Sequence, residues 1–326
     1  MAFISMSTQA APQVSQLFQF TYPTSVKNLY TLPNGCLLLS TSANADLWYI
    51  DPEALYPSAE KVVTLSGTTG VALDSFAALG NGLYAVSGGP PPQSNLQAPM
   101  QVYVVKVETE GDVNVTVEDT VGVPALSMDG TAALPKYPST ILSADGIGGR
   151  ILRINTTDHT LSVAFEHTAF QPGDGGDALA PGVKGLKIRD NYLYFTNSAQ
   201  RIFGRFPINE VGTNTGDLEV LARLNYTSDG AAYGDFSFDS EGNAFVAVHP
   251  SSVHKITPEG VQSVFAGGVN STFLGPTSVV VSNDGKSIYV STAGKDSGFP
   301  ITGGQVLKVQ VGGNCTQNRP SLQKRR

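Results

Sequence analysis

One hairpin decides the fold: residues 183–196 read VKGLKIRDNYLYFT. Two apolar, partly alternating runs flank the polar pair Asp190-Asn191, and turn residues between two such runs are a strong signal of a β-hairpin. An isolated hairpin is at best marginally stable in water, because it cannot bury its apolar faces. The stretch therefore predicts one part of a sheet that packs against other sheets.

The same unit recurs along the chain at spacings of roughly 40 to 55 residues, the period of propeller blades. Each unit has a first strand, a turn, a second strand that often ends in Ser or Thr, and a third strand rich in Val, Ile and Tyr. First strands are expected at 26–31, 70–73, 128–131, 183–188, 234–238 and 276–280, and second strands at 37–40, 83–86, 140–143, 193–196, 245–248 and 288–291. The segment 13–20 is expected to supply the outer strand of the last blade. We therefore predict an all-β fold, a six-bladed β-propeller with four-stranded antiparallel blades around a central channel.

The composition fits this fold and excludes several partners. Charged residues make up 14% of the chain and glycine accounts for 35 of 326 residues, a mixture that suits short strands and tight turns. The net charge of -7 argues against a nucleic acid as partner. No run of about twenty apolar residues is present, so no membrane span is expected. We expect a monomer or weak homodimer, with the propeller at 13–313, a disordered segment or signal remnant at 1–12, and a tail at 314–326.

Two features indicate the secretory pathway. Five Asn-x-Ser/Thr sequons are present, at Asn114, Asn155, Asn225, Asn270 and Asn314. Such sequons are acceptors for glycans in secreted proteins. The two cysteines, Cys36 and Cys315, lie near opposite ends of the chain, and a ring-shaped fold brings its ends together. We expect a glycoprotein of the secretory pathway or a secreted protein, in which these cysteines either form a disulfide or remain two buried free thiols.

The blades resemble the senescence-marker-protein/gluconolactonase family, and more closely its divergent fungal branch. The similar stretches are spread over nearly the whole chain, and their order is more specific than any one of them. They are Lys27-Asn28-Leu29 with Tyr49-Ile50-Asp51-Pro52, residues 182–190 and 192–197, residues 234–239, and residues 270–277.

The resemblance implies one divalent cation on the propeller axis, held by Glu, Asn, Asn and Asp near the starts of innermost strands. On this sequence those positions fall on Lys27, Asp129, Lys184 and Gly234, or on Asp235 if the register shifts by one residue. A protonated lysine has no lone pair for a cation and repels it at close range. We therefore expect no metal and no cofactor, and a catalytic cluster of Lys27, Asp129 and Lys184. The alternative is that the lysines point into solvent at a wide channel mouth.

Other candidate residues are expected at the same end of the channel, where they would bind substrate. They are Asp235, Gln200, Arg201, Phe203, His249, Thr277 and Lys295. Most of them are expected in loops that follow the second strand of a blade, and the loop at 88–99 is a candidate rim or lid. The sequence contains no nucleophile elbow, phosphate-binding glycine loop or Cys-x-x-Cys motif.

Three functions follow as hypotheses, all with a small, largely apolar molecule as partner. Some members of the fungal branch that the chain resembles are hetero-Diels–Alderases, which join a tropolone-derived quinone methide to a humulene-type sesquiterpene. Such a reaction needs a shaped cavity and oriented donors but no metal. The second hypothesis is a metal-dependent lactonase or esterase of the gluconolactonase type, which needs a metal-activated water. The third is a propeller that binds a small molecule without catalysis.

Overall fold

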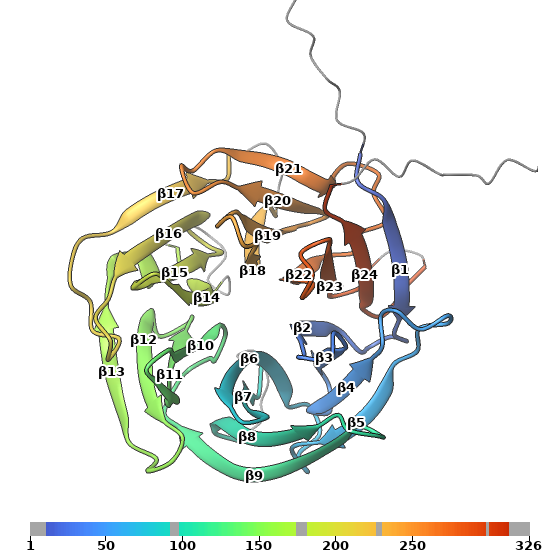
Figure 1. The fold of residues 1–326 in the computed structure, drawn as a ribbon. Helices are drawn as coiled ribbons and strands as arrows, with labels where there is room; N and C mark the ends of the chain where they lie inside the picture. Colours follow the sequence, from blue (N-terminus) through green and yellow to red (C-terminus); the bar gives the residue numbers. More distant parts are fainter. Residues whose placement is uncertain (1–10, 92–97, 174–180, 226–229, 298–299, 313–326) are drawn as a thin grey trace, which may run out of the picture.

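The computed structural model describes residues 11–91, 98–173, 181–225, 230–297 and 300–312 of the 326-residue chain. Six four-stranded antiparallel sheets surround a central channel in this part of the chain, which confirms the predicted six-bladed β-propeller (Figure 1). The one helix described is a single turn of 3-10 helix, η1 (Thr168–Phe170). None of the described helices is long and apolar enough to cross a membrane.

The strands of each blade follow one another from the central channel to the rim of the ring. Blade one contains, from the innermost strand outward, β2 (Val26–Thr31), β3 (Leu37–Thr41), β4 (Asp46–Ile50) and β5 (Glu60–Thr64). Blade two contains β6 (Ala72–Gly80), β7 (Leu83–Gly89), β8 (Met100–Glu108) and β9 (Asn114–Val123). Blade three contains β10 (Thr131–Leu134), β11 (Tyr137–Asp145), β12 (Arg150–Asn155) and β13 (Leu161–Glu166).

The second half of the ring repeats this order. Blade four contains β14 (Val183–Arg189), β15 (Tyr192–Asn197), β16 (Ile202–Pro207) and β17 (Glu219–Arg223). Blade five contains β18 (Ala232–Phe238), β19 (Ala244–His249), β20 (Ser252–Ile256) and β21 (Gln262–Gly267). Blade six contains β22 (Pro276–Val281), β23 (Ser287–Thr292), β24 (Gln305–Gln310) and, from the start of the chain, β1 (Val14–Gln19).

Strand β1 closes the ring, as the sequence predicts for residues 13–20. It pairs antiparallel with β24, from Val14 opposite Val309 to Gln19 opposite Gln305. The two strands lie side by side at the edge of the ring in Figure 1. The pairing ties the N-terminal segment to the last blade, so the first and last blades are held together by a hydrogen-bonded ladder as well as by packing.

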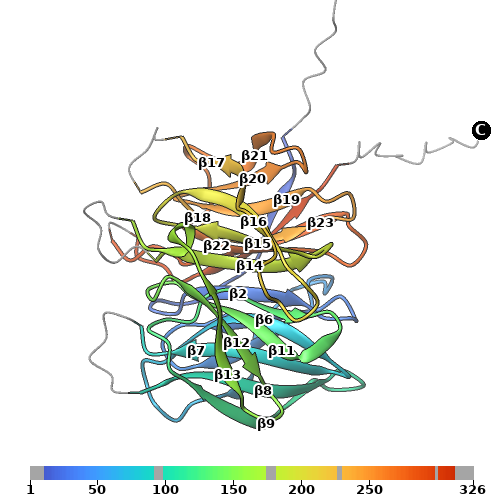
Figure 2. The ribbon, with the colours of Figure 1, turned by 90° about the vertical axis from the view of Figure 1, so that its left-hand side faces the viewer.

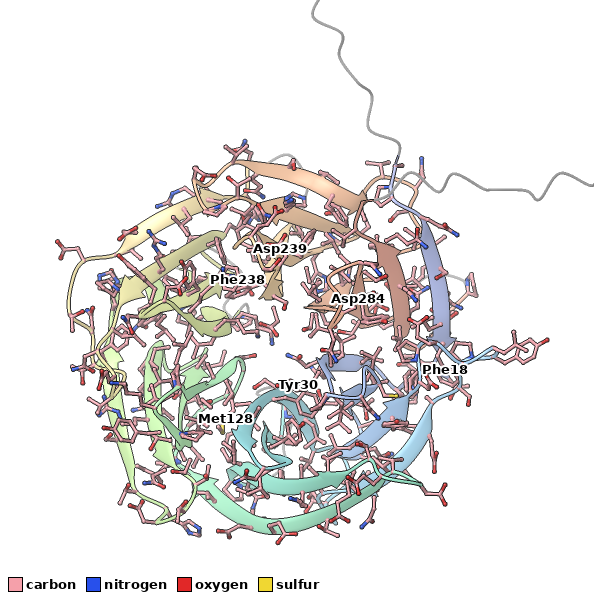
Figure 3. All side chains as sticks on the ribbon, in the orientation of Figure 1. Phe18, Tyr30, Met128, Phe238, Asp239 and Asp284 are labelled. Atoms are coloured by element: carbon pink, nitrogen blue, oxygen red, sulfur yellow. The ribbon has the colours of Figure 1, made fainter. Side chains whose placement is uncertain are left out.

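The hydrophobic core is divided into six clusters, one between each pair of neighbouring blades. The cluster between blades six and one, for example, joins Tyr289 and Val306 to Leu29, Leu37 and Leu39. Every blade therefore has both faces covered by its neighbours, and side chains fill the spaces between the blades in Figure 3. The inner strands run through the thickness of the ring, which Figure 2 shows edge-on.

Two first strands differ from the sequence-based expectation. In blade two the strand begins at Ala72 and continues to Gly80, because the polar pair Asp74-Ser75 interrupts its apolar pattern without ending the strand. In blade three the strand begins only at Thr131. The preceding Gly130 passes so close to blade four that its N–H donates to the Lys184 carbonyl at 2.6 Å, outside the regular ladder.

The predicted disulfide remains a prediction. Cys36 is 8% exposed and lines a surface groove together with Lys308 and Gly312, whereas Cys315 lies outside the described residues. Since Gly312 is only three residues before Cys315 in the sequence, we expect the bond to form. Its loss in Cys36→Ser should cost on the order of 2–5 kcal/mol of unfolding free energy. Peptide mapping without reduction tests the pairing, and two thiols that alkylate freely in secreted material would contradict it.

The sequons give a graded prediction for glycosylation and secretion. Asn114, Asn225 and Asn270 are exposed, whereas the Asn155 side chain is partly buried and accepts hydrogen bonds from the N–H groups of Thr157 and Asp158. Asn314 lies outside the described residues. We expect glycans at the three exposed sites, and lower occupancy at Asn155, when the protein is made in a fungal host. Glycopeptide mass spectrometry measures the occupancy, and unmodified peptides at all sites would contradict a secretory location.

Candidate functional site

A β-bulge recurs near the start of the inner strands and turns one side chain of each affected blade toward the axis. The pairing of inner and second strands skips Lys27 in blade one, Asp74 in blade two and Thr277 in blade six. In blades four and five it skips two residues, Lys184-Gly185 and Gly234-Asp235. Because bulged residues leave the ladder and bend the strand, they can direct side chains into a site.

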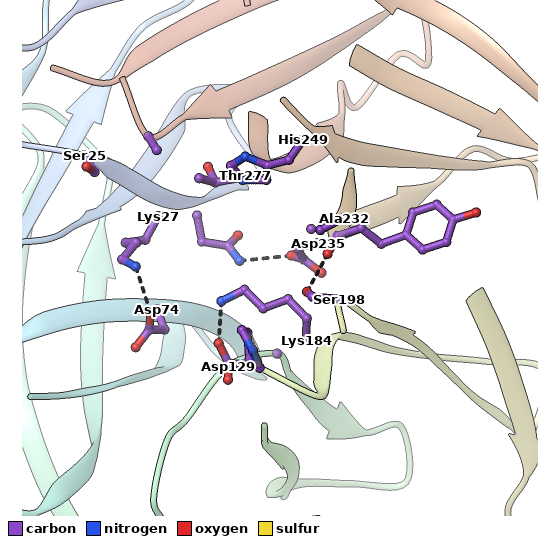
Figure 4. Close-up of a pocket in the computed structure, with 16 residues that line it drawn as sticks. Ser25, Lys27, Asp74, Asp129, Lys184, Ser198, Ala232, Asp235, His249 and Thr277 are labelled. Atoms are coloured by element: carbon purple, nitrogen blue, oxygen red, sulfur yellow. Dashed lines mark hydrogen bonds and ion pairs between the residues drawn. The ribbon is translucent and has the colours of Figure 1, made fainter. Parts of the chain in front are cut away.

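These bulges, together with Asp129 just before β10, bring the predicted residues into one pocket at one mouth of the channel (Figure 4). The pocket has a volume of about 350 Å³, within the size range of ligand sites. All three residues predicted as a catalytic cluster line it, and so do three predicted substrate-binding residues. The six are Lys27, Asp129, Lys184, Asp235, His249 and Thr277.

Two lysine–aspartate pairs form the polar part of this axial pocket. The Lys184 ammonium forms an ion pair and a hydrogen bond with Asp129, and the Lys27 ammonium lies 3.9 Å from the Asp74 carboxylate. The exposed fractions are 27% for the Lys184 side chain and 8% for that of Asp129, so this pair is largely desolvated. These two pairs balance each other, and the third carboxylate of the lining, Asp235, forms an ion pair with Lys187.

Burial and neighbouring charges shift the pKa values of Lys184 and Asp74. Burial disfavours the charged form of Lys184, but the Asp129 and Asp74 carboxylates outweigh burial and hold its pKa above the ordinary value. Lys184 is therefore a permanent ammonium at neutral pH. Burial raises the pKa of Asp74, although the Lys27 and Lys184 ammonium groups oppose this shift.

Two glycines allow the neighbouring blades to approach this closely. A Cβ atom on Gly130 would lie 2.5 Å from the Lys184 carbonyl oxygen, and one on Gly185 would lie 2.8 Å from the Asp235 carboxylate. A side chain at Gly130 would separate blades three and four, and thereby Asp129 from Lys184. At Gly185 it would displace the Asp235 carboxylate.

Asp235 connects blades across the axis below the pocket. Its carboxylate accepts hydrogen bonds from Asn28 Nδ2 at 3.0 Å and Ser278 Oγ at 3.1 Å. It also accepts two from Lys187 Nζ, at 2.7 and 2.9 Å. The Asp235 charge is thus fully engaged, so this residue fixes the floor of the axial pocket instead of presenting a free carboxylate to a ligand.

His249 and Thr277 line the pocket on the side opposite Lys184 and Asp129 (Figure 4). Burial lowers the pKa of His249, and the positive charges of Lys184 and Lys27 lower it further. The imidazole is therefore neutral at pH 7 and able to accept a proton. The Thr277 hydroxyl donates to the Val26 carbonyl at 2.8 Å, which ties blade six to blade one.

The four remaining predicted residues are not among the described residues that line the axial pocket. Gln200 donates to the carbonyls of Thr168 and Gln171, and Arg201 adjoins it in the turn before β16. The backbone of Lys295 pairs with Thr302. The loop position expected for Phe203 is wrong: it lies in β16, is 1% exposed, and packs in the core against Phe236, because the turn after β15 ends at Arg201.

A smaller cavity of about 180 Å³ adjoins the axial pocket between blades two and three. Lys27, Asp74, Asp129 and Lys184 line both cavities, and the other walls of the smaller one are mainly apolar. These walls include Pro90, Pro91, Met100, Met128 and Ile147. We call it the apolar subpocket. Pro90 and Pro91 belong to the loop predicted as a rim, and residues 92–97 of that loop lie outside the described residues.

Asp74 is the charged residue of the axial pocket that the sequence analysis missed. A signal was present, because Leu73-Asp74 has the same form as Val26-Lys27, Met128-Asp129 and Val183-Lys184: a buried apolar residue followed by a charged one. The predicted strand in blade two ended at Leu73, one residue too early to reveal it.

The side chains of the axial pocket do not fit the divalent cation that the resemblance to the gluconolactonase family implies. Lys27 and Lys184 occupy two of the four ligand positions, and the Lys184 ammonium binds Asp129, which would be a third. Within the described residues no group of three or more His, Cys, Asp or Glu side chains is arranged to hold a metal. An ammonium group on blade four thus neutralises the carboxylate that would otherwise face a cation.

Comparisons with known proteins support the fold. No model of a protein family matches the sequence, and no curated protein matches it. Among solved structures, a luciferin-regenerating enzyme is similar with a TM-score of 0.64 and 15% identity over 93% of this chain and 96% of that one. Regucalcin from Agrobacterium tumefaciens, described as a calcium-binding protein, is similar with a TM-score of 0.63 and 11% identity over 93% and 95%. A gluconolactonase-like protein is similar with a TM-score of 0.58 and 12% identity over 93% of both chains.

The lysines make a testable prediction about metal binding. The wild-type protein should show no tight binding of Ca²⁺ or Zn²⁺ in isothermal titration calorimetry. The double variant Lys27→Glu/Lys184→Asn removes both ammonium groups and adds oxygen donors beside Asp74 and Asp129, so it should gain Ca²⁺ affinity. Lys286→Glu, at an exposed position, is the control that should gain none. One tightly bound divalent ion per wild-type chain would overturn this interpretation.

Proposed function

We propose that the protein is an enzyme that acts without a metal ion on two small molecules, one with an ionisable oxygen and one that is largely apolar. The observation that carries the proposal is the pair of ammonium groups, Lys27 and Lys184, in a charge-balanced pocket that opens into an apolar subpocket. The ammonium groups suit an anionic or polarised oxygen, and the apolar wall of the subpocket, which includes Met100, Met128 and Ile147, suits a hydrocarbon. The names of the similar propellers support an enzyme more than a structural role.

The reaction we propose is a hetero-Diels–Alder cycloaddition between a tropolone quinone methide and a humulene-type alkene. In the first step a hydroxymethyl tropolone loses the proton of its ring hydroxyl and the hydroxide of its side chain, which together leave as water. In the second step the quinone methide and the alkene form one C–C and one C–O bond, and no atom leaves. Neither step changes the oxidation state of the reactants taken together, and neither needs a cofactor.

The side chains of the axial pocket have separate roles in this scheme. Lys27 and Lys184 donate hydrogen bonds to the tropolone oxygens and draw electron density from the heterodiene. Asp129 keeps Lys184 charged and oriented. His249, held neutral by burial and by the lysines, accepts the proton of the ring hydroxyl and passes it to the departing hydroxide, which leaves as water. Confining two reactants in adjoining cavities supplies a large part of the rate enhancement through proximity.

A lactone hydrolase remains the second candidate, since a gluconolactonase-like protein shares the fold. Hydrolysis by the metal-dependent route requires a bound cation, which the lysine positions oppose. The third candidate, binding without turnover, uses the same pocket. Product analysis separates the three candidates, because cycloaddition forms an adduct, hydrolysis opens a lactone, and binding without turnover leaves the ligand unchanged.

The test is product formation from a hydroxymethyl tropolone and humulene, measured by liquid chromatography and mass spectrometry with a chelator present. We expect the wild-type protein to accelerate formation of the adduct. Lys184→Met alone would leave Asp129 buried and unpaired, which is strongly destabilising. The double variant Lys184→Met/Asp129→Asn removes both charges together, and it should fold and lose roughly 10²-fold in rate.

The controls decide between the candidates. Lys286→Met, at a position 81% exposed, should retain the wild-type rate. Wild-type hydrolysis of a lactone panel that stops on chelation would favour the second candidate. Unchanged adduct formation in the double variant would contradict the assigned roles of Lys184 and Asp129, and no adduct with saturable substrate binding would favour the third candidate.

A further inference from the structure

The channel has a second pocket at its other mouth, which the proposed function does not use. This far-mouth pocket has a volume of about 550 Å³ and is lined by all six inner strands. Asn28 and Asp235 line both it and the axial pocket, and the hydrogen bond between them lies at the boundary of the two. The far-mouth pocket is therefore a separate site, and its chemistry is set by residues that follow the bulges along the inner strands.

Three aromatic residues contribute to its wall. Tyr30, Phe76 and Phe238 come from blades one, two and five, and Figure 3 shows Tyr30 and Phe238 near the channel. The Tyr30 ring is held by an edge contact with Tyr84 at 5.2 Å and by Phe76 at 6.3 Å between ring centroids. Rings fixed in this way present preformed apolar faces to a flat ligand.

Lys187 and Arg189 of β14 are the two cations that line the far-mouth pocket, and Asp235 is the one carboxylate among its lining residues. Lys187 uses two of its three N–H donors on Asp235, so one remains. Arg189 donates to the carbonyls of Asp239 and Ser240 and to the exposed Asp190 carboxylate, which leaves two of its five N–H donors. These bonds hold both cationic groups in place before any ligand arrives.

The charge and hydrogen-bond balance of the pocket favours an anion. Its lining residues carry two positive charges and one negative charge, from Lys187, Arg189 and Asp235. Within the described residues the Tyr30 hydroxyl makes no hydrogen bond, so it adds a further donor. Asp190, which pairs with Arg189, is 80% exposed and does not line the pocket, so a ligand carboxylate can still bind the free N–H donors of Lys187 and Arg189. A planar ring would fill the space between the aromatic side chains.

We propose that the far-mouth pocket binds an aromatic monocarboxylate. The carboxylate contacts Lys187 and Arg189, and the ring packs against Tyr30, Phe76 and Phe238. This proposal does not rest on the proposed function, because it uses other residues at the other mouth of the channel.

Isothermal titration calorimetry with 2-naphthoate tests the proposal, with neutral 2-naphthalenemethanol as the matched probe. We expect saturable binding of 2-naphthoate and about tenfold weaker binding of the alcohol, because charge-assisted hydrogen bonds are the stronger ones. Ala78, an exposed residue of β6, points into the pocket, so Ala78→Trp should fill it and abolish binding. Arg189→Gln should weaken binding about tenfold.

Matched variants separate a specific effect from general damage. Ala54→Trp, in the loop after β4, and Arg223→Gln, at the exposed end of β17, should both bind like the wild type. The axial variant Lys184→Met/Asp129→Asn should also bind normally. If Ala78→Trp fails to fold, the comparison of Arg189→Gln with Arg223→Gln still shows whether 2-naphthoate binds in the far-mouth pocket.

Three results would overturn the proposal: no binding at millimolar 2-naphthoate, equal affinity for the acid and the alcohol, or loss of binding in the axial variant with retention in Ala78→Trp. The last would place the probe in the axial pocket. A wild-type protein that binds 2-naphthoate but does not accelerate the cycloaddition would count against the proposed function alone.

Discussion

The structure depends on the closure of the ring by β1. No blade can bury both faces of its sheet alone, so each relies on the next, and the chain of contacts is complete only when the first and last blades meet. The ladder between Val14–Gln19 and β24 completes blade six with the segment that leads directly into blade one, and the cluster around Leu29, Leu37 and Val306 packs the two blades together. The functional site follows from the same closure, because Lys27 of blade one meets residues of blades two to six only in a closed ring.

The fold could be predicted from the sequence because its signals are local. Turn pairs such as Asn81-Gly82 and Asp190-Asn191 carry positive φ angles in the structure, the conformation for which Asn and Gly are suited. The apolar runs on either side of these turns form the strands. The strand starts in blades two and three were harder to predict, because a bulge or an approach between blades, as at Gly130, depends on neighbours that are distant in sequence.

The candidate site was predictable where a position repeats from blade to blade. Lys27, Asp129 and Lys184 share a register, and the structure brings them into one pocket. Loop positions carried no such repeat, and an aromatic residue such as Phe203 is equally suited to a core and to a ligand pocket. The binding of Asp235 by Lys187 is a contact between blades, for which the sequence gives no spacing rule.

The pairing of charges gives the two mouths of the channel different electrostatics. Lys184 with Asp129, and Lys27 with Asp74, leave the axial pocket close to neutral, so an apolar molecule can enter without facing an unbalanced buried charge. The ammonium groups nevertheless direct N–H donors into the pocket. They can attract an oxygen atom of a ligand, as a metal cation at the same place would. Asp235 takes no part in that balance, because Lys187 binds it from the far side. The two mouths thus have separate electrostatics, divided by one carboxylate that both of them share.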